Sequence, residues 1–292
     1  MKSIVIYYFS GTGNTLKVSQ LLKEALEIRG SQVKLISIES LMKNSEKIEI
    51  VNYDLIGIAY PIYGFGTPSL IEHFIKNFPE GKGKDLFLYK TGADFISINH
   101  NASVNQIIDL EKKGYNVFYD RIIAMSPNWI FSYDNRITKQ LYLTAVRKVK
   151  HMSQEILGLQ RRRNHTGPIL KGLSKGIAYC EDKYGAGYFG KSLKTNLDCN
   201  MCGICQNNCP NGNIKITENK IIFSDQCLWC MRCVYNCPQK AIFSKGLNFC
   251  IIKDGYNLDK ILNDESISSE FIRENTKGYF KHFIKYISDD SI

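Results

Sequence analysis

Two short stretches of the chain each carry four cysteines followed by a proline. They read DCNMCGICQNNCP (residues 198–210) and QCLWCMRCVYNCP (residues 226–238). Both follow the spacing C-x2-C-x2-C-x3-C-P, in which the first three thiolates can converge on one small inorganic group while the fourth points away from it. With two such runs, each fourth cysteine completes the site of the other run.

The repeated spacing therefore predicts two [4Fe–4S] clusters with crossed ligand sets. One set is Cys199, Cys202, Cys205 and Cys237, and the other is Cys227, Cys230, Cys233 and Cys209. Structural zinc sites usually draw on two separated cysteine pairs, and disulfide frameworks are typical of secreted proteins, so neither alternative fits this pattern well. The two remaining cysteines, Cys180 and Cys250, are expected to be small buried hydrophobic residues.

Apolar neighbours complete the expected cluster module. The residues predicted to keep water away from the clusters are Ile204, Ile214, Val234 and Ile242. Between the two cysteine runs, residues 214–224 (IKITENKIIFS) predict two short strands around a turn at Glu218 and Asn219. Over about residues 195 to 246 the chain resembles the bacterial two-cluster ferredoxin, which implies a small α+β domain.

A second chemical signal lies near the N-terminus, where the loop SGTGNT (residues 10–15) follows an apolar run and precedes a helical pattern. The loop lacks the lysine of a Walker loop, and Leu16 stands where a dinucleotide-binding turn has its third glycine. It offers hydroxyls, one amide and the backbone N–H groups of a helix start, which can bind a phosphate without a neighbouring cation. We therefore expect a phosphate site in this loop.

Alternating strand and helix patterns surround the loop and predict an α/β fold with a doubly wound, five-stranded parallel sheet. Strands are expected at residues 4–8, 32–38, 54–60, 85–91 and 115–123, and helices from Leu16 and at 69–77, 103–113 and 136–157. Such sheets bind ligands at the carboxyl ends of their strands. The loops 9–15, 60–68 and 91–99 are therefore expected to meet at one site.

These loops resemble those of flavodoxins, and the resemblance covers about residues 1 to 160. It implies that the FMN phosphate is held by Ser10, Gly11, Thr12, Gly13, Asn14 and Thr15, and the flavin ring by Pro61, Ile62, Tyr63, Gly64, Thr91, Gly92, Ala93 and Asp94. Tyr63 is the candidate for stacking on the ring, and Gly64 would leave room for a peptide to turn toward the flavin N5. Trp129, after the fifth strand, is expected to serve packing more than flavin contact.

The net charge of +10 is concentrated in one segment. Between Arg136 and Lys175 there are ten Lys or Arg residues and one acid, Glu155. A solvated helix face and linker is the favoured interpretation, and a docking face for an acidic redox protein is the alternative. No nucleic-acid module is recognisable, so we expect no nucleic-acid partner. Small flavodoxins are acidic whereas this chain is basic, so their partners cannot simply be transferred.

The order of the segments resembles a fused flavodoxin–ferredoxin family of anaerobes. It implies a flavodoxin-like FMN domain (1–160), a basic connector (161–194), a two-cluster ferredoxin-like domain (195–246) and a helical tail (247–292) that packs back onto one of them. If the connector is extended, a homodimer with flavin and clusters paired across chains is left open. The N-terminus reads as a strand and not a signal peptide, and no run of about 20 apolar residues occurs, so we expect a cytoplasmic protein without membrane insertion.

The combination predicts an iron–sulfur flavoprotein that passes electrons between an external redox protein, two clusters and FMN. The alternative is an FMN-dependent reductase of a small oxidant such as a quinone, a disulfide or another flavin. His100, Asp94 and Tyr63 would be its first candidates for proton delivery, although His100 is expected to be a surface loop residue. A non-redox scaffold or oxygen sensor remains a third class. No catalytic residue is assigned.

Overall fold

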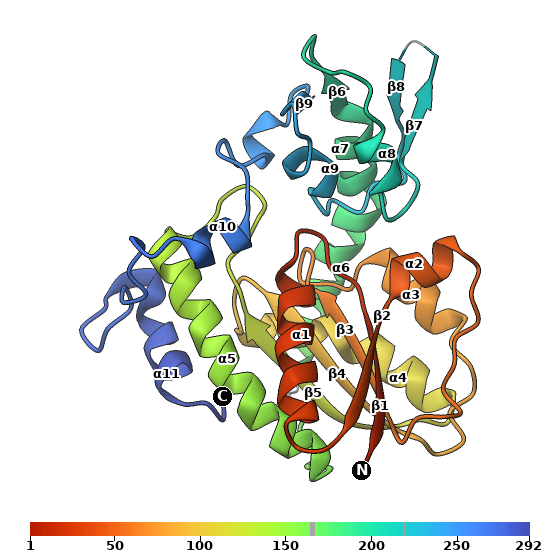
Figure 1. Cartoon of the computed structure of the whole chain (residues 1–292), viewed down its shortest axis with the longest axis vertical. Helices are drawn as coiled ribbons and strands as arrows, with labels where there is room; N and C mark the ends of the chain where they lie inside the picture. Colours follow the sequence, from red (N-terminus) through yellow and green to blue (C-terminus); the bar gives the residue numbers. More distant parts are fainter. Residues whose placement is uncertain (164–166, 219) are drawn as a thin grey trace.

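The structure is a computed structural model that describes residues 1–163, 167–218 and 220–292. It contains a parallel sheet flanked by helices (residues 1–157, the sheet module), a helical connector, a small cysteine-rich part (residues 193–250, the cysteine module) and a tail (residues 251–292). The cysteine module lies beyond one end of the sheet (Figure 1). Asn219, at the predicted turn in the cysteine module, lies outside the described residues.

The sheet module confirms the predicted five-stranded parallel sheet. Its strands are β1 (Ser3–Tyr8), β2 (Gln32–Ser37), β3 (Leu55–Pro61), β4 (Asp85–Gly92) and β5 (Asn116–Ala124). They lie in the order β2-β1-β3-β4-β5, and all neighbouring pairs are parallel. This is the flavodoxin-like order, in which the chain switches direction between β1 and β3. The buried strands read as continuous apolar runs because both faces of the sheet are covered.

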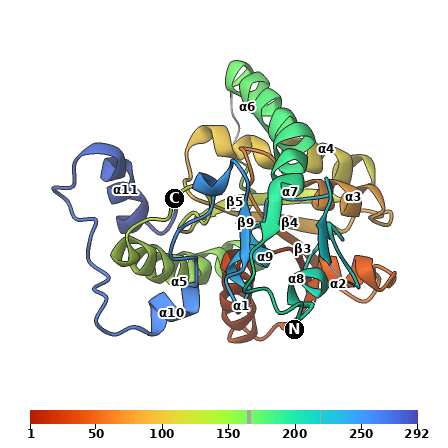
Figure 2. The same ribbon diagram turned by 90° about the horizontal axis from the view of Figure 1, so that it is seen from above.

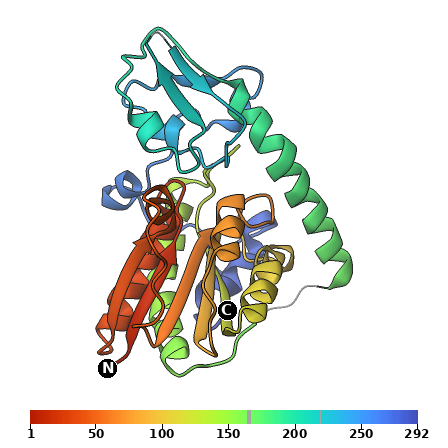
Figure 3. The same ribbon diagram turned by 90° about the vertical axis from the view of Figure 1, so that its right-hand side faces the viewer.

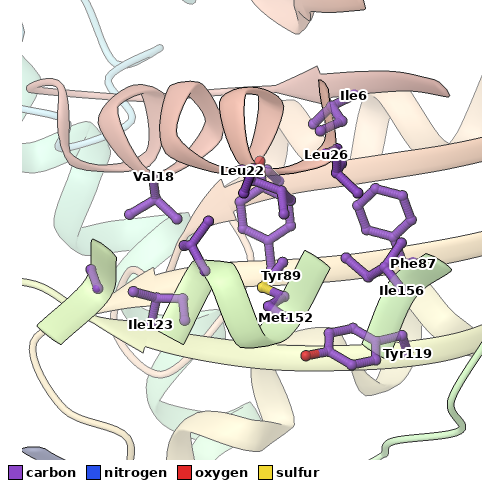
Figure 4. Packing of buried hydrophobic residues seen from close by; sticks show 14 of the residues in the cluster. Ile6, Val18, Leu22, Leu26, Phe87, Tyr89, Tyr119, Ile123, Met152 and Ile156 are labelled. Carbon is purple, nitrogen blue, oxygen red and sulfur yellow. The ribbon is translucent and has the colours of Figure 1, made fainter. Parts of the chain in front are cut away.

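Helices cover both faces of the sheet. One layer holds α1 (Asn14–Glu27) and α5 (Asn135–Leu157), and the other holds α2 (Ile38–Lys43), α3 (Ser69–Lys76) and α4 (Val104–Lys112). Figure 4 shows how Leu22 of α1 and Met152 of α5 meet over Tyr89 of the sheet. Among the described residues, no helix is long and apolar enough to cross a membrane.

The connector is helical from Pro168 to Ser192, and not extended. Helix α6 (Pro168–Cys180), a π-helical turn (Glu181–Ala186) and α7 (Gly187–Ser192) follow one another without a break. They run along the side of the sheet module and lead into the cysteine module (Figure 3). Ser174 of α6 accepts a hydrogen bond from Asn101 Nδ2 at 2.8 Å, in the 3-10 turn Ser97–Ser103 of the sheet module. The two modules of one chain are therefore adjacent.

The cysteine module is built from short elements. Two antiparallel pairs, β6 (Leu193–Thr195) with β9 (Ile242–Ser244) and β7 (Ile214–Thr217) with β8 (Lys220–Phe223), enclose the short helices α8 (Ile204–Asn207) and α9 (Arg232–Tyr235). The 3-10 turn Asn248–Cys250 ends the module. The β7–β8 pair matches the two strands predicted between the cysteine runs. A core of Phe189, Leu193, Ile214, Met231 and Ile242 holds it together.

The tail packs on α5 and the end of β5 and so explains much of the basic segment. It contains α10 (Leu258–Asn263), the 3-10 turn Gly278–His282 and α11 (Phe283–Ser288), which lie beside α5 in Figures 1 and 2. Lys148 is fully buried and donates to the carbonyl oxygens of Asp289 (2.6 Å) and Ile292 (2.9 Å).

Other cations of the basic segment bind the tail as well. Lys139 donates to the Asp264 carbonyl at 2.8 Å, and Arg147 and Arg162 donate to those of Ile287 and Ser291. The favoured interpretation of the segment as a solvated face is therefore wrong for the buried Lys148, whereas Arg147 stays exposed while it binds the tail. Many of the tail's contributions are backbone oxygens, which a count of charged residues does not reveal.

Candidate cofactor site

A cavity of about 400 Å³ lies at the carboxyl ends of the sheet strands, next to the switch between β1 and β3. Ligands of doubly wound sheets bind at this position. The predicted loop residues that line the cavity are Ser10, Gly11, Thr12, Asn14, Thr15, Pro61, Ile62, Tyr63, Gly64, Thr91, Gly92, Ala93 and Asp94. The remaining predicted residue, Gly13, does not line it and instead caps the N-terminus of α1.

Sequence reasoning assigned no site role to several other residues of the cavity wall. They are Phe65, Ile96, Asn99, Ser126, Pro127, Asn128, Phe131, Glu181, Trp229 and Tyr279. Trp129, for which packing was favoured, also lines the cavity. Glu181 comes from the π-helical turn, Trp229 from the second cysteine run and Tyr279 from the tail. Three parts of the chain far from the sheet therefore complete a site that the sheet begins.

The loop of residues 10–15 forms one end of the cavity. The Thr15 and Thr91 hydroxyls lie 2.7 Å apart, and Asn14 is fixed between the Ser126 carbonyl (2.9 Å) and the Tyr256 hydroxyl (2.6 Å). The Ser10 hydroxyl is buried and has no hydrogen-bond partner among the described residues. Together with the free N–H groups at the start of α1, this end offers donors to an anion. The lining residues include no Lys or Arg.

Part of the cavity wall is aromatic. Trp129 and Trp229 meet with ring centroids 4.6 Å apart, and Trp229 stacks on Phe189 of the connector at 5.3 Å. The Tyr63 hydroxyl reaches toward the loop of residues 10–15 and lies beside Gly11. The cavity thus combines polar groups suited to a phosphate with aromatic side chains suited to a flat ring.

Tyr279 of the tail forms part of the cavity wall beside Asp94. The buried Asp94 carboxylate accepts hydrogen bonds from the Phe95 N–H (2.7 Å) and the Tyr279 hydroxyl (2.8 Å), and His282 Nε2 lies 2.9 Å from it. The Tyr133 hydroxyl donates to the Ala93 carbonyl at 3.0 Å. Asp94 was expected to contribute backbone groups, and its side chain instead anchors the tail to the site.

Glu181 introduces a carboxyl group beside the loop of residues 61–64. Gly64 has a positive φ of 50°, and a β-carbon there would clash with Glu181 Oε2, so glycine allows this approach. Burial, and secondarily the charge of Asp182, raises the pKa of the Glu181 carboxyl from 4.5 to about 7. The cavity therefore contains a group that can hold or release a proton near neutral pH.

The eight clustered cysteines line two separate cavities. One is lined by Cys209, Cys227, Cys230 and Cys233 (the inner cysteine cavity), and the other by Cys199, Cys202, Cys205 and Cys237 (the outer cysteine cavity). The membership of each set matches the crossed sets that the spacing predicted. Of the predicted apolar residues, Ile214 lines the inner cavity, Ile204 and Ile242 line the outer cavity, and Val234 packs between them in the core.

The inner cavity is poorly solvated. Burial raises the pKa of the Cys230 thiol to about 11 and that of Cys227 to about 12. Thiolates in this environment need a positive partner, which a metal group supplies. In the described part of the chain, no group of three or more His, Cys, Asp or Glu side chains could hold a metal ion. A four-iron cluster differs because each cysteine binds its own iron atom.

The inner cysteine cavity touches the loop of the large cavity. A β-carbon on Gly11 would lie 2.9 Å from the Cys230 carbonyl oxygen, so the two backbones approach as closely as glycine permits. Arg232 fixes this approach, because its guanidinium donates to the carbonyl oxygens of Ser10 and Gly11. The same guanidinium makes a bidentate ion pair with Glu39 of α2, at 2.6 and 2.8 Å.

Other candidates from the sequence lie outside the site. His100 is half-buried in the turn Ser97–Ser103 and does not line the cavity, so its prediction as a surface loop residue is wrong. Desolvation, and secondarily Lys90, lowers the pKa of His100 to about 4. Cys250 is buried as predicted, whereas Cys180 is exposed on α6 because that helix touches the sheet module along its other side.

No protein-family model matches the chain, and no curated protein matches it. Its fold is similar to solved flavodoxin structures. One is a flavodoxin from the domain Archaea, with 12% identity over 53% of this chain and 99% of that chain and a TM-score of 0.37. Another is flavodoxin 2 from Bacillus cereus, with 20% identity over 53% and 98% and a TM-score of 0.39.

The structure of one enzyme is as similar to this chain as the flavodoxin structures are. It is the apo form of the NADH:FMN oxidoreductase EMOB, with 18% identity over 58% of this chain and 99% of that chain and a TM-score of 0.39. At these low scores, the assignment of the flavodoxin-like fold rests on the strand order of the sheet.

The raised pKa of Glu181 makes the stability of the chain pH-dependent. The folded state holds the Glu181 proton more tightly than the unfolded state, so the stability is greatest below the ordinary pKa of 4.5 and falls as the pH rises through about 7. In Glu181→Gln this loss is absent. We expect the variant to gain stability over the wild type in urea unfolding at about pH 8, and to gain little at about pH 5. Glu270→Gln, whose side chain is 76% exposed, is the matched control. If Glu181→Gln changed the free energy of unfolding equally at both pH values, the raised pKa of Glu181 would be contradicted.

Arg232 is predicted to hold the two modules together. In Arg232→Met, the Glu39 carboxylate and the Ser10 and Gly11 carbonyls lose their donor, and we expect the free energy of unfolding to fall by about 3 kcal/mol. Amide hydrogen exchange should rise in residues 10–13 and 229–233 together. The double variant Arg232→Met/Glu39→Met should recover part of the loss, because no unpaired charge is left. Arg273→Met, at an exposed ion pair, is the control. A change below about 0.5 kcal/mol in Arg232→Met would contradict the role.

Proposed function

We propose that the chain is an electron-transfer iron–sulfur flavoprotein. FMN occupies the large cavity, one [4Fe–4S] cluster occupies each cysteine cavity, and an external redox protein exchanges electrons with the clusters. The observation that carries the proposal is the division of eight cysteines into two crossed sets of four, one of which lies against the loop of the large cavity.

The large cavity fits FMN in size and chemistry. Its volume of about 400 Å³ lies within the range of small-molecule sites. The unpaired Ser10 hydroxyl and the start of α1 would hold the phosphate, and the guanidinium of Arg232 binds the same loop through the Ser10 and Gly11 carbonyls. The aromatic side chains Tyr63, Trp129 and Trp229 would hold the ring.

FMN when bound exchanges one or two electrons, and each cluster exchanges one, so the pair supplies conversion between single-electron and two-electron chemistry. The chain's own contribution is positioning. Gly11 lets the loop approach Cys230, and Arg232 keeps it there. Trp129 and Trp229 exclude water on one side, and Tyr279, anchored on Asp94, excludes it on another. The Glu181 carboxyl can hold a proton at the cavity wall.

A crossed-ligand experiment tests the clusters. After anaerobic purification and reconstitution, we expect two four-iron clusters and one FMN per chain. Because Cys199 and Cys237 belong to one set, Cys199→Ser/Cys237→Ser should lose one cluster and keep the other. Cys199→Ser/Cys209→Ser removes a ligand from each set and should lose both. Iron and sulfide analysis with EPR of the reduced protein measures this, and Cys180→Ser is the control. If Cys199→Ser/Cys237→Ser lost both clusters and Cys199→Ser/Cys209→Ser lost only one, the crossed sets would be wrong. Absence of bound iron or of FMN in the wild type would overturn the proposal.

A second function is favoured by a groove that opens beside the large cavity. The groove encloses about 670 Å³, and Trp129, Glu181 and Trp229 line both it and the cavity. Leu173, Gly176 and Ile177 of α6 form its other wall. A small, flat, apolar oxidant such as a quinone could approach the ring along this path, which would make the chain an FMN-dependent reductase.

A groove-filling variant separates the two functions. Gly176→Trp is expected to fit, because a β-carbon on Gly176 would meet no atom within 4 Å. If the chain is a reductase, it should reduce a water-soluble quinone in steady state, and Gly176→Trp should lose most of this turnover while keeping its FMN and iron. If the chain is a carrier, quinone turnover should be slow and equal in both proteins.

A further inference from the structure

The cysteine module carries cations that the chain itself does not neutralise. Lys194, Lys215, Lys220 and Lys240 are exposed, and none of them forms an ion pair with a described residue. The exposed acids of the same module are Asp198, Glu218 and Asp225, and Asp225 already pairs with Lys191 at 2.8 Å. In contrast, Lys139, Arg147 and Lys148 of α5 bind the tail. The cysteine module therefore carries unpaired positive charge close to the cysteines, in addition to exposed lysines elsewhere such as Lys76 and Lys82.

These lysines alternate with exposed apolar side chains. Lys194 pairs with Phe243 across β6 and β9, and Lys215 pairs with Ile222 across β7 and β8. Directly opposed residues of an antiparallel pair share one face, so each pair presents one cation and one apolar group outward. Phe243 and Ile222 are 39% and 40% exposed, and Leu197, two residues before Cys199, is fully exposed.

The lysines border the outer cysteine cavity. Lys220 and Lys240 adjoin Ile221 and Gln239, which line that cavity, and Ile204 of its wall is 37% exposed. Cys202 itself is exposed. In Figures 1 and 3 this end of the molecule points away from the five-stranded sheet. We call Lys194, Lys215, Lys220 and Lys240 with Leu197, Ile204, Ile222 and Phe243 the outer face.

The two cysteine cavities differ in their surroundings. Among the described residues, neither cysteine cavity shares a lining residue with the large cavity, but Cys230 of the inner cavity lies beside Gly11, which lines the large cavity. A redox protein that docks on the outer face would come close to the outer cavity only. The inner cavity would then lie between it and the flavin site.

We propose that the outer face is the docking surface for an acidic one-electron carrier protein, which would exchange single electrons with a cluster held by Cys199, Cys202, Cys205 and Cys237, while the inner cysteine cavity would lie between that cluster and the flavin site. The inference rests on the proposed function. Opposite charge steers the encounter, and the apolar side chains supply contact area once the partners meet. Each step moves one electron from a reduced centre to an oxidised one, and no bond is made or broken.

Charge reversal on the outer face tests the proposal in the full-length, cofactor-loaded chain. The probe is a plant-type [2Fe–2S] ferredoxin, an acidic one-electron carrier. At about 10 mM ionic strength, Lys215→Glu/Lys220→Glu should slow reduction by this ferredoxin at least about tenfold. The same variant should weaken the binding of dye-labelled, oxidised ferredoxin, measured by fluorescence anisotropy without electron transfer. Added salt should slow the wild type and leave the variant nearly unchanged.

Two controls separate docking from other causes. Lys76→Glu/Lys82→Glu reverses two exposed lysines of the sheet module and should change neither rate nor affinity by more than about twofold. Reduced methyl viologen, a small cation that needs no docking surface, should reduce wild type and both variants at similar rates.

The outcomes distinguish this inference from the proposed function. If methyl viologen does not reduce the loaded chain, the proposed function fails and this inference fails with it. If methyl viologen reduces it but ferredoxin binds and reacts equally with wild type and with Lys215→Glu/Lys220→Glu, only the docking surface is overturned. A loss of affinity for a single-stranded oligonucleotide in that variant, with unchanged ferredoxin binding, would assign the outer face to nucleic acid and overturn the proposal as well.

Discussion

The arrangement of the site depends on one side chain, the guanidinium of Arg232. It binds the carbonyl oxygens of Ser10 and Gly11 and the carboxylate of Glu39. It thereby connects the second cysteine run to the loop of residues 10–15 and to α2. A charged group with several partners is costly to leave unpaired, so this contact fixes the relative position of the modules more firmly than apolar packing alone. Gly11 makes the contact close, because any side chain there would meet Cys230.

Two other segments, the connector helix and the tail, add residues to the large cavity. On one side, the connector helix brings Glu181 and the π-helical turn to the cavity. On the other side, the tail binds the cations of α5 through backbone carbonyls and places Tyr279 on Asp94. Both segments follow the sheet in the chain without belonging to it. They leave the exposed lysines of the cysteine module, Lys194, Lys215, Lys220 and Lys240, unpaired among the described residues.

Much of this was predictable from local patterns. Cysteine spacing and the alternation of apolar runs with helices are short-range signals, and they predicted the crossed cysteine sets, the five strands and the loops that meet at the cavity. Trp229 was missed although its place between Cys227 and Cys230 is a usable signal. Glu181 and Tyr279 have no such signal, because only tertiary packing brings them to the cavity. The basic segment was misinterpreted for the same reason, since its partners are backbone oxygens about 140 residues away.

The central claim is that flavin and clusters exchange electrons within one chain across the Gly11–Cys230 contact. Anaerobic stopped-flow absorbance tests it most directly. The loaded protein is mixed with less reductant than the clusters can accept, and the bleaching of the flavin is followed at several protein concentrations. We predict a bleaching rate that does not depend on the protein concentration and that falls in Arg232→Met, because the transfer is intramolecular. A rate proportional to the protein concentration, or a flavin that stays oxidised while the clusters are reduced, would contradict the account.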